Sequence, residues 1–217
     1  MHDILLIDKP SGITSFDVIR RLRGSPLSQG VKKMGHAGTL DPLATGLLII
    51  GLDKATKQLA DFMNLPKEYE VLIEFGKIST TYDADGVVID VIARSEATKQ
   101  SPLVTRENFS ESLKNFIGEI SQIPPIFSAK RIKGRRAYDL ARKGTPVKLE
   151  PQRVNIYSIE IISWQWPFVG LHVKCGKGTY IRSLAHDLGQ ALGCGGYVKE
   201  LRRTAIGDFR VEDAQGI

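Results

Sequence analysis

The chain has few of the residues that build metal centres and disulfide frameworks. Its 217 residues contain two cysteines, Cys175 and Cys194, and four histidines. The cysteines form no CxxC pair and the histidines are scattered along the chain, which argues against a zinc site. One disulfide is formally possible, but two reduced thiols fit an intracellular chain better. We therefore expect no metal.

Long apolar segments are missing as well. Apolar runs such as Leu47–Ile50 are far too short to cross a bilayer. The opening residues, MHDILLIDKP, place an acid before a short apolar run and so do not resemble a secretory signal. We expect a cytoplasmic protein that makes no membrane contact.

What the chain does contain is enough apolar material for a sizeable core. Hydrophobic residues make up 42% of the sequence, which suits one large domain with or without a small appendage. The net charge is +6 and the isoelectric point about 9.3. This excess is compatible with a polyanionic partner only if the positive charge is clustered.

Hydrophobic periodicity predicts a mixture of strands and helices. Strands are expected at residues 4–7, 47–51, 69–75, 87–91, 154–163, 168–175 and 197–209. Helices are expected at residues 14–24, 55–63, 105–120, 137–143 and 179–192, the first opened by a capping box of Thr14 and Asp17. Residues 83–86 read as a hairpin turn and 94–104 as an exposed loop. Because the order is not a regular βαβ alternation, we predict an α+β fold with a mixed, largely antiparallel sheet flanked by helices.

The densest segment surrounds Asp41, in the sequence GHAGTLDPLATGLL of residues 35–48. Glycines on both sides and Pro42 directly after it imply a tight backbone that presents the carboxylate with little freedom. An alternative is that Asp41 caps a short helix whose first residue is Pro42. On this segment alone the capping interpretation is favoured, because Asp-Pro helix starts are common.

Two further segments carry charged or glycine-rich patterns. Residues 176–178 form a Gly-Lys-Gly loop, but the spacing of a Walker loop is absent. Arg182 follows in the first turn of the expected helix, where a cation is unfavourable against the helix dipole unless a carboxylate compensates. A surface arginine is the simpler alternative.

A basic stretch covers residues 130–148. It contains Lys130, Arg131, Lys133, Arg135, Arg136, Arg142, Lys143 and Lys148 against one acid, Asp139. Glycines at positions 134 and 144 favour a mobile phosphate-binding element over a solvated helix face. Tyr138 could stack on a base.

Together these segments resemble the TruB family of tRNA pseudouridine(55) synthases over nearly the whole chain. The matching segments are Lys9–Ser15, residues 35–48, Lys67–Tyr69, Thr81–Gly86, Ile123–Pro125, Phe127–Ala129, Arg136–Arg142, GKGTYIRSLAHDLG at 176–189, and Leu201–Thr204. Each short piece is weak by itself, whereas the Asp41 segment and the order of the set are specific. The resemblance implies a pseudouridine-synthase fold, action on the T-arm of tRNA, no cofactor and a monomer.

The resemblance also implies roles for individual residues. Asp41 looks like the catalytic aspartate and Arg182 like its ion-pair partner. Tyr69 looks like the residue that stacks on the target uracil, His36 like one that helps hold the flipped nucleotide, and Leu201 like part of the pocket wall. The basic stretch, about residues 128–148, looks like the mobile thumb of the family. The layout implied is a catalytic domain at 1–210 and a short remnant at 211–217, without the PUA-type RNA-binding domain that is usual in the family.

Two other functions remain open at this point. The scaffold could be a non-catalytic tRNA-binding or RNA-folding module, although the presence of Asp41, Tyr69 and Arg182 argues against it. A nucleotide-binding enzyme using Gly176–Gly178 is less suitable, because that loop is too short for a dinucleotide fingerprint.

Overall fold

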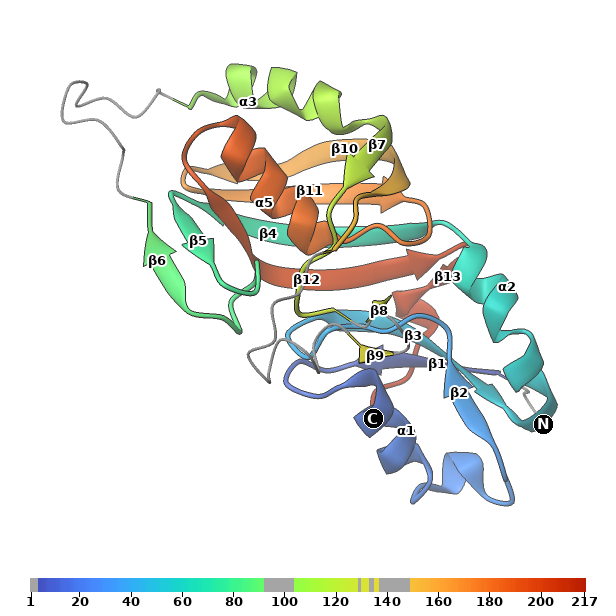
Figure 1. Ribbon diagram of the computed structural model, residues 1–217. Helices are drawn as coiled ribbons and strands as arrows, with labels where there is room; N and C mark the ends of the chain where they lie inside the picture. The colour runs from blue at the N-terminus through green and yellow to red at the C-terminus, as the bar shows by residue number, and fades with distance from the viewer. Residues whose placement is uncertain (1–3, 92–103, 129, 133–134, 137–148) are drawn as a thin grey trace. The chain divides into compact units, whose positions relative to one another are not determined.

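The computed structural model describes residues 4–91, 104–128, 130–132, 135–136 and 149–217 (Figure 1). The loop expected at 94–104 lies outside these ranges apart from its last residue. The short helix expected at 137–143 lies wholly outside them. In the part that is described, strands and helices are mixed, which confirms the α+β fold class predicted from the sequence.

The elements follow one another as strands interrupted by short helices. The strands are β1 (Ile4–Lys9), β2 (Met34–His36), β3 (Thr45–Leu52), β4 (Lys67–Phe75), β5 (Lys77–Ser79), β6 (Val88–Asp90), β7 (Gly118–Gln122), β8 (Arg131–Ile132), β9 (Arg135–Arg136), β10 (Gln152–Gln165), β11 (Phe168–Cys175), β12 (Gly196–Ile206) and β13 (Phe209–Arg210). The α-helices are α1 (Ser15–Leu22), α2 (Leu59–Asn64), α3 (Arg106–Leu113) and α5 (Ile181–Ala191). Single turns of 3-10 helix occur at η1 (Pro26–Ser28), η2 (Asp53–Lys57), η3 (Lys114–Phe116) and η4 (Val211–Asp213).

The main sheet is mixed, as predicted. Its strand order is β1-β3-β12-β4-β11-β10-β7, with β2 paired to β3 and β13 paired to β12. β1 pairs antiparallel with β3, and β7 with β10, whereas β12 runs parallel to β3 with Arg203 opposite Gly46. Two hairpins, β5-β6 and β8-β9, form separate two-stranded sheets. The hairpin turn predicted at 83–86 is confirmed, although β6 pairs with β5 and not with the longer β4.

Three expected elements are shorter than the sequence indicated. The helix opened by Thr105 ends at Leu113 instead of continuing to Ile120, because Gly118 at φ 98° turns the chain into β7. The apolar residues beyond the helix therefore belong to a strand. The helix expected at 55–63 is divided into η2 and α2 at Gln58. The last strand is divided into β12 and β13 by Gly207 at φ 56°.

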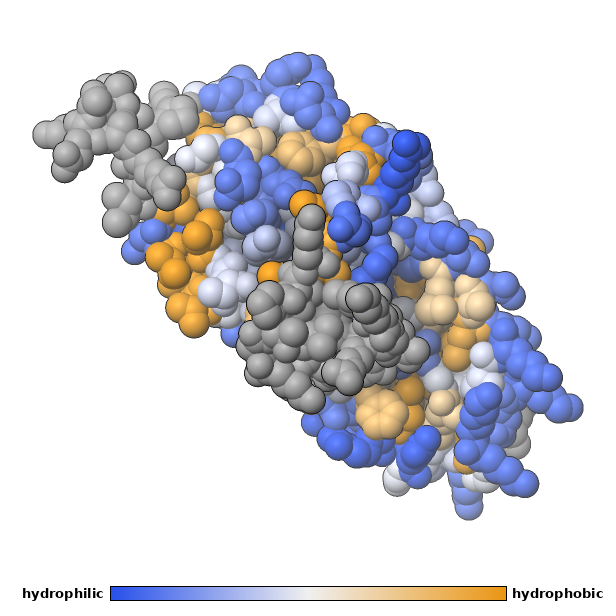
Figure 2. Space-filling model, in the orientation of Figure 1, coloured by the Kyte–Doolittle hydropathy of each residue, from blue (hydrophilic) through white to orange (hydrophobic). Residues whose placement is uncertain are grey.

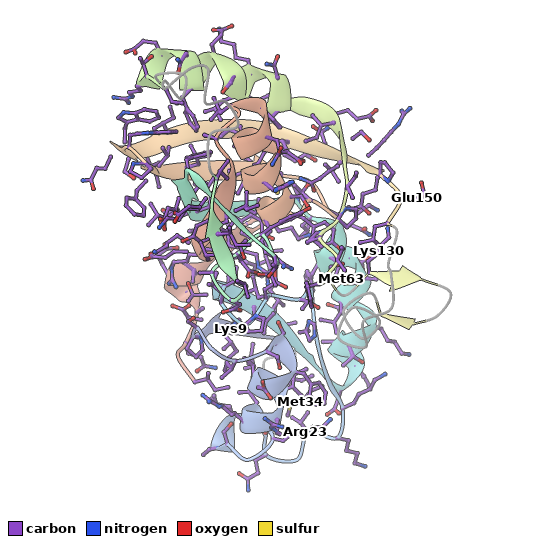
Figure 3. All side chains as sticks on the ribbon, turned by 60° about the vertical axis from the view of Figure 1, so that its left-hand side comes forward. Lys9, Arg23, Met34, Met63, Lys130 and Glu150 are labelled. Atoms are coloured by element: carbon purple, nitrogen blue, oxygen red, sulfur yellow. The ribbon has the colours of Figure 1, made fainter. Side chains whose placement is uncertain are left out.

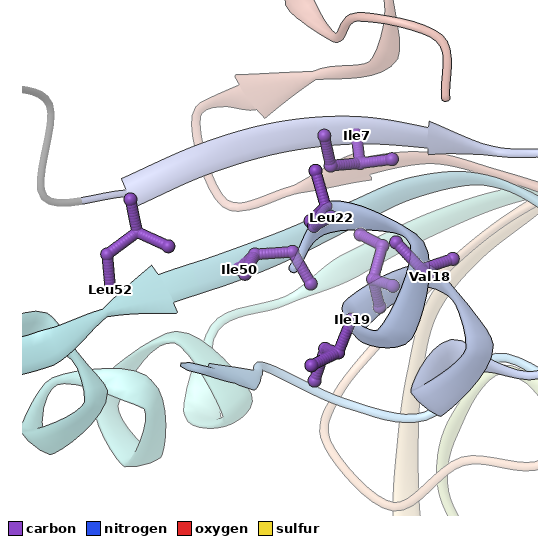
Figure 4. Close-up of a cluster of buried hydrophobic side chains, with 7 residues drawn as sticks. Ile7, Val18, Ile19, Leu22, Ile50 and Leu52 are labelled. Carbon is purple, nitrogen blue, oxygen red and sulfur yellow. The ribbon is translucent and has the colours of Figure 1, made fainter. Parts of the chain in front are cut away.

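The chain divides into two compact units. The first contains residues 1–70, 174–177 and 201–217, and the second contains residues 71–173 and 178–200. In the first unit, β3 is buried on both faces. Leu48, Ile50 and Leu52 pack with Val18, Ile19 and Leu22 of α1 and with Ile7 of β1 (Figure 4), while Leu47 and Ile49 pack with Ala37, Ile206 and Val211. The apolar stripe predicted for α1 and its capping box of Thr14 and Asp17 are both present.

The last residues belong to the first unit. After η4, the backbone of Gln215 bonds with β1 in both directions: Asp8 N donates to Gln215 O at 2.9 Å, and Gln215 N donates to Leu6 O at 3.0 Å. Val211 is 6% exposed. The segment expected as a remnant therefore packs along the edge of β1.

Aromatic rings form part of the core of the second unit. Phe75 stacks on Trp166 at 5.4 Å between ring centroids, and Phe109 of α3 meets the edge of Phe75 at 5.5 Å and lies 5.2 Å from Trp164. On the surface of this unit, apolar side chains gather over the β5-β6 hairpin (Figure 2), where Val87 is 67% and Ile89 52% exposed. No helix in the described ranges is both long and apolar enough to cross a membrane.

In the second unit, a buried carboxylate interacts with three other side chains. Glu74 on β4 accepts a hydrogen bond from the hydroxyl of Tyr197 and ion pairs with Lys199 at 3.0 Å and Lys77 at 2.9 Å. Burial alone would raise the pKa of this carboxyl, but the hydrogen bonds from Tyr197, Lys77 and Lys199 outweigh it and lower the pKa to about 2. The ionised form of Glu74 is therefore bound tightly in the fold.

This network predicts an acid-dependent loss of stability. Because the folded pKa of Glu74 lies below its ordinary value, the stabilisation is complete above about pH 4.5 and is lost as the pH falls towards 2. We expect the free energy of unfolding to decline by up to about 3 kcal/mol over that window through this group. Urea unfolding of the wild type and Glu74→Gln at several pH values measures it. Glu119→Gln is the matched control, because Glu119 is 62% exposed in its pair with Arg153. If the free energy of unfolding depends on pH equally in the wild type and in Glu74→Gln, Glu74 is not the source of the acid-dependent loss of stability.

Candidate active site

Asp41 lies in a loop between β2 and β3. Residues 37–44 contain no helical turn, so the interpretation of Asp41 as a helix cap with Pro42 at the first helical position is wrong. Instead, Ala44 N donates to Asp41 O at 3.1 Å and closes a turn of the loop, and the Asp41 side chain is partly exposed. The carboxylate is thus presented by a tight loop at the start of a buried strand.

A buried lysine holds this loop against the segment after β1. Lys9 (labelled in Figure 3) is fully buried, and its ammonium donates to Pro10 O at 2.8 Å, Ile13 O at 2.7 Å and Pro42 O at 3.2 Å. Gly12 N donates to the same Pro42 carbonyl at 2.8 Å. The residue next to Asp41 is therefore held by two donors from the Lys9–Ser15 segment.

Serines of the same segment complete the cradle. Ser11 Oγ donates to Leu43 O at 3.0 Å, and the buried Ser15 Oγ both donates to Leu40 O at 3.2 Å and accepts from Leu40 N at 2.8 Å. Hydrogen bonds thus hold the backbone on both sides of Asp41. A carboxylate on a loop that is already fixed in the folded protein loses little further conformational entropy when it reacts.

Tyr69 lies close enough to Asp41 for the two groups to interact. The phenol, on β4, has its pKa raised by burial and by the negative charge of Asp41, while the guanidinium of Arg203 acts in the opposite direction. The residue as a whole is partly exposed. The structure therefore brings together two of the residues that the sequence singled out.

Two more of the predicted residues belong to the same unit. His36 ends β2, paired with Ile50 of β3, and is partly exposed. Leu201 on β12 is 8% exposed, and its carbonyl accepts from Thr45 Oγ1 at 3.4 Å at the start of β3. Asp41, Tyr69, His36 and Leu201 thus come from three different segments of one compact unit.

Arg182 belongs to the second unit, in the first turn of α5, as the sequence predicted. Its guanidinium forms an ion pair with Asp83 at 3.1 Å, with the two side chains 5% and 4% exposed. It also donates to Thr81 O at 2.9 Å and to Phe127 O at 2.8 Å. The sequence called for a carboxylate partner but did not identify Asp83. The pairing of Arg182 with Asp41 stays a prediction.

The start of α5 is anchored by a buried amide. Gln122 is fully buried, and its side chain accepts from Tyr180 N at 2.8 Å and donates to Tyr180 O at 3.0 Å. Ser183 Oγ adds a bond to Ile123 O at 2.7 Å. These contacts fix the helical turn that carries Arg182.

The basic thumb is described only in part. Arg131 and Arg135–Arg136 form the small β8-β9 hairpin, and Lys130 (labelled in Figure 3) is exposed and donates to Gln152 Oε1 at 2.8 Å. Lys133, Arg142 and Lys143 lie outside the described residues. Among the residues that are described, no three histidine, cysteine or acidic side chains come together as a potential metal site, and both cysteines are free thiols.

Sequence reasoning missed Arg203 and the role of Lys9. Arg203 is 1% exposed, and its Nε donates to Leu47 O at 2.8 Å. The only signal was the alternation within Leu201–Thr204, which indicates that Arg202 and Arg203 face opposite sides of the sheet. It does not say which of the two is buried.

Family profiles cover nearly all of the chain. Residues 27–181 match the N-terminal domain of the TruB family of pseudouridylate synthases, and residues 182–216 match the C-terminal domain of tRNA pseudouridylate synthase B. The chain is 46% identical to tRNA pseudouridine synthase B of Aquifex aeolicus, over 99% of this chain and 71% of that protein. It is 43% identical to the protein of the same name from Phocaeicola vulgatus, over 99% of this chain and 90% of that protein.

Solved structures show the same fold. A Cbf5-Nop10-Gar1 complex contains a chain that matches with a TM-score of 0.72 and 29% identity, covering 99% of this chain and 52% of that one. An H/ACA RNP bound to a substrate RNA containing 2'-deoxyuridine matches with a TM-score of 0.68 and 28% identity. The chain spans about half the length of each of these two solved chains.

Proposed function

Because the chain belongs to the TruB family of pseudouridylate synthases, we propose that it converts a T-loop uridine of tRNA, uridine 55 in tRNA numbering, to pseudouridine. The N1–C1′ bond breaks, the uracil turns, and C5 joins C1′ while C5 loses a proton and N1 gains one. Atoms and oxidation state balance, so the residues of the chain can carry the reaction without a cofactor.

The observation that carries this proposal is the presentation of Asp41. The Lys9 ammonium, the Gly12 amide and the Ser15 hydroxyl form hydrogen bonds with the loop backbone and hold it on both sides of the carboxylate. A side-chain oxygen fixed in this way suits a carboxylate that acts as a nucleophile or base at the sugar or the uracil ring. We assign Asp41 as the catalytic residue.

The neighbouring residues have roles in holding the substrate under this proposal. The target base is stacked in folded tRNA and must be extruded before it reacts. Tyr69 stacks on the extruded uracil, His36 helps to hold the flipped nucleotide, and Leu201 forms part of the pocket wall. Arg182 pairs with Asp41 and keeps it ionised. The partial exposure of Tyr69 and its electrostatic interaction with Asp41 support this arrangement.

Binding of tRNA is assigned to the basic stretch. Lys130, Arg131, Lys133, Arg135, Arg136, Arg142 and Lys143 would neutralise phosphates of the T-arm, and such contacts supply affinity that falls with salt. We propose that the protein acts as a monomer in the cytoplasm.

A minimal T-arm hairpin tests the function. Wild-type protein without added cofactor should release tritium from C5 of the target uridine and yield pseudouridine in the recovered RNA. A hairpin with cytidine at that position is the control for background. Binding of the hairpin with no conversion would overturn the proposal and favour a non-catalytic tRNA-binding module.

A further inference from the structure

Among the residues that the structure describes, Arg203 is the largest fully buried side chain, and no carboxylate there pairs with its charge. Its guanidinium donates from Nε to Leu47 O at 2.8 Å and from Nη2 to Gly38 O at 3.2 Å. These two acceptors are backbone carbonyls, and the Tyr69 side chain is a further hydrogen-bond partner of the guanidinium. Burial of a guanidinium without a counter-ion costs desolvation free energy. Such a residue is expected to have a function that depends on its charge.

The adjacent arginine shows the contrast. Arg202 makes two hydrogen bonds to the Asp8 carboxylate, at 3.0 and 2.7 Å, with side chains 38% and 33% exposed. Successive residues of a strand face opposite sides of the sheet, so one arginine is paired at the surface and the other is buried. The two residues differ in partner and burial but not in chemistry, which makes Arg202 a matched reference.

The backbones of β12 and β3 approach each other closely at Arg203. Arg203 lies opposite Gly46 in the parallel β12-β3 pair, and a Cβ at Gly46 would lie 2.3 Å from Arg203 O. Gly46 also has φ 102°, a region that side chains disfavour. The guanidinium is thereby brought to Gly38, three residues before Asp41, where its Nη1 would lie 3.6 Å from a Cβ on that glycine. The hydrogen bond from Arg203 to Gly38 O thus links β12 to the segment that leads to Asp41.

The charge of Arg203 also reaches two groups on β4. Burial lowers the pKa of Lys67 to about 8, and the Arg203 charge adds to this effect. Burial raises the pKa of the Tyr69 phenol, and the Arg203 charge opposes that rise, whereas the Asp41 charge reinforces it. The Tyr69 phenol therefore lies in the fields of both Asp41 and Arg203.

We propose that Arg203 is a positioning residue for the isomerisation, which holds the Asp41 loop and the Tyr69 phenol in one arrangement beside a fixed positive charge. This inference rests on the proposed function. Arg203 does not touch the substrate, because it is buried. It acts through the Gly38 carbonyl and through the electrostatic field at Tyr69.

Two substitutions separate charge from packing. Arg203→Lys keeps the charge, and Arg203→Gln keeps a hydrogen-bond donor but removes the charge. We expect the glutamine variant to raise the pKa of Tyr69 further and to lower kcat on the T-arm hairpin by about tenfold or more. The Kd for the hairpin should change by less than about threefold, because phosphate contacts supply most of the affinity. Arg203→Lys should restore most of kcat.

The titration of Tyr69 is read separately from activity. The signal of Tyr69 is the part of the tyrosinate absorbance that disappears in Tyr69→Phe. It is measured as a function of pH in each Arg203 variant. The control is Arg202→Gln, in which Tyr69 should titrate as in the wild type. Folding is checked by thermal denaturation. A folded Arg203→Gln with wild-type Tyr69 titration, or with wild-type kcat, would overturn the proposal.

A second measurement applies if Arg203→Gln does not fold. In the wild type, the NMR signal of the Arg203 guanidinium should shift as Tyr69 ionises and stay constant in Tyr69→Phe, and an unchanged signal would overturn the proposal. A wild-type protein that makes no pseudouridine, yet shows this coupled titration, would refute the proposed function while supporting the Arg203–Tyr69 interaction.

Discussion

Replacement of Asp41 by asparagine is expected to lower pseudouridine formation by at least about 10⁴-fold, which corresponds to more than about 5 kcal/mol of activation free energy. Asparagine keeps the shape of the side chain and its hydrogen-bonding capacity but lacks the charge and the nucleophilic oxygen. Because hydrogen bonds from Lys9, Gly12 and Ser15 hold the loop by its backbone and not by the Asp41 side chain, the loop should survive the exchange. Binding of tRNA should survive as well, since phosphate contacts dominate affinity.

Single-turnover assays on the T-arm hairpin, with binding measured in parallel, give this result directly. Asp53→Asn is the matched control in the same unit: Asp53 accepts from Lys32 N and Lys33 N at 3.0 and 2.9 Å, a structural role that asparagine can keep. The control should retain wild-type turnover. A folded, tRNA-binding Asp41→Asn protein that still turns over would end the assignment of Asp41 as catalytic.

Asp83→Asn is expected to destabilise the second unit by about 3–5 kcal/mol, because it removes the charge that forms an ion pair with the buried Arg182 at 3.1 Å. Asparagine can still accept from Thr81 Oγ1 and Asp85 N, as Asp83 Oδ1 does, so the loss reports the charge and not the turn. We also expect a large fall in kcat, since Arg182 would lose one of the contacts that fix its guanidinium.

Urea unfolding compares this variant with Asp85→Asn, an exposed acid of the same turn that should be close to neutral. The double variant Asp83→Asn, Arg182→Met should lose less stability than the sum of the single changes, because it removes the uncompensated charge. Additive losses would show that the two side chains do not stabilise each other.

The helix α1 illustrates what local sequence can predict. Its capping box and its apolar stripe are local signals, and both appear where expected. The helix after Thr105 shows the limit: the apolar spacing continues to Ile120, but Gly118 turns the chain and the last residues enter β7. Apolar periodicity indicates which residues are buried, and it does not say in which element they are buried when a helix runs directly into a strand.

The sequence by itself determined the family, through the order of its motifs, and with it the prediction that Asp41, Tyr69 and Arg182 are site residues. Only the tertiary structure decided which of two adjacent arginines is buried, Arg203, and which is half-exposed, Arg202. It also decided the pairing of Arg182 with Asp83 and the hydrogen bond from Lys9 to the Pro42 carbonyl. The last two join residues that lie 99 and 33 positions apart. Local patterns report which face of an element a side chain occupies, whereas its partner depends on which distant segment packs against that face.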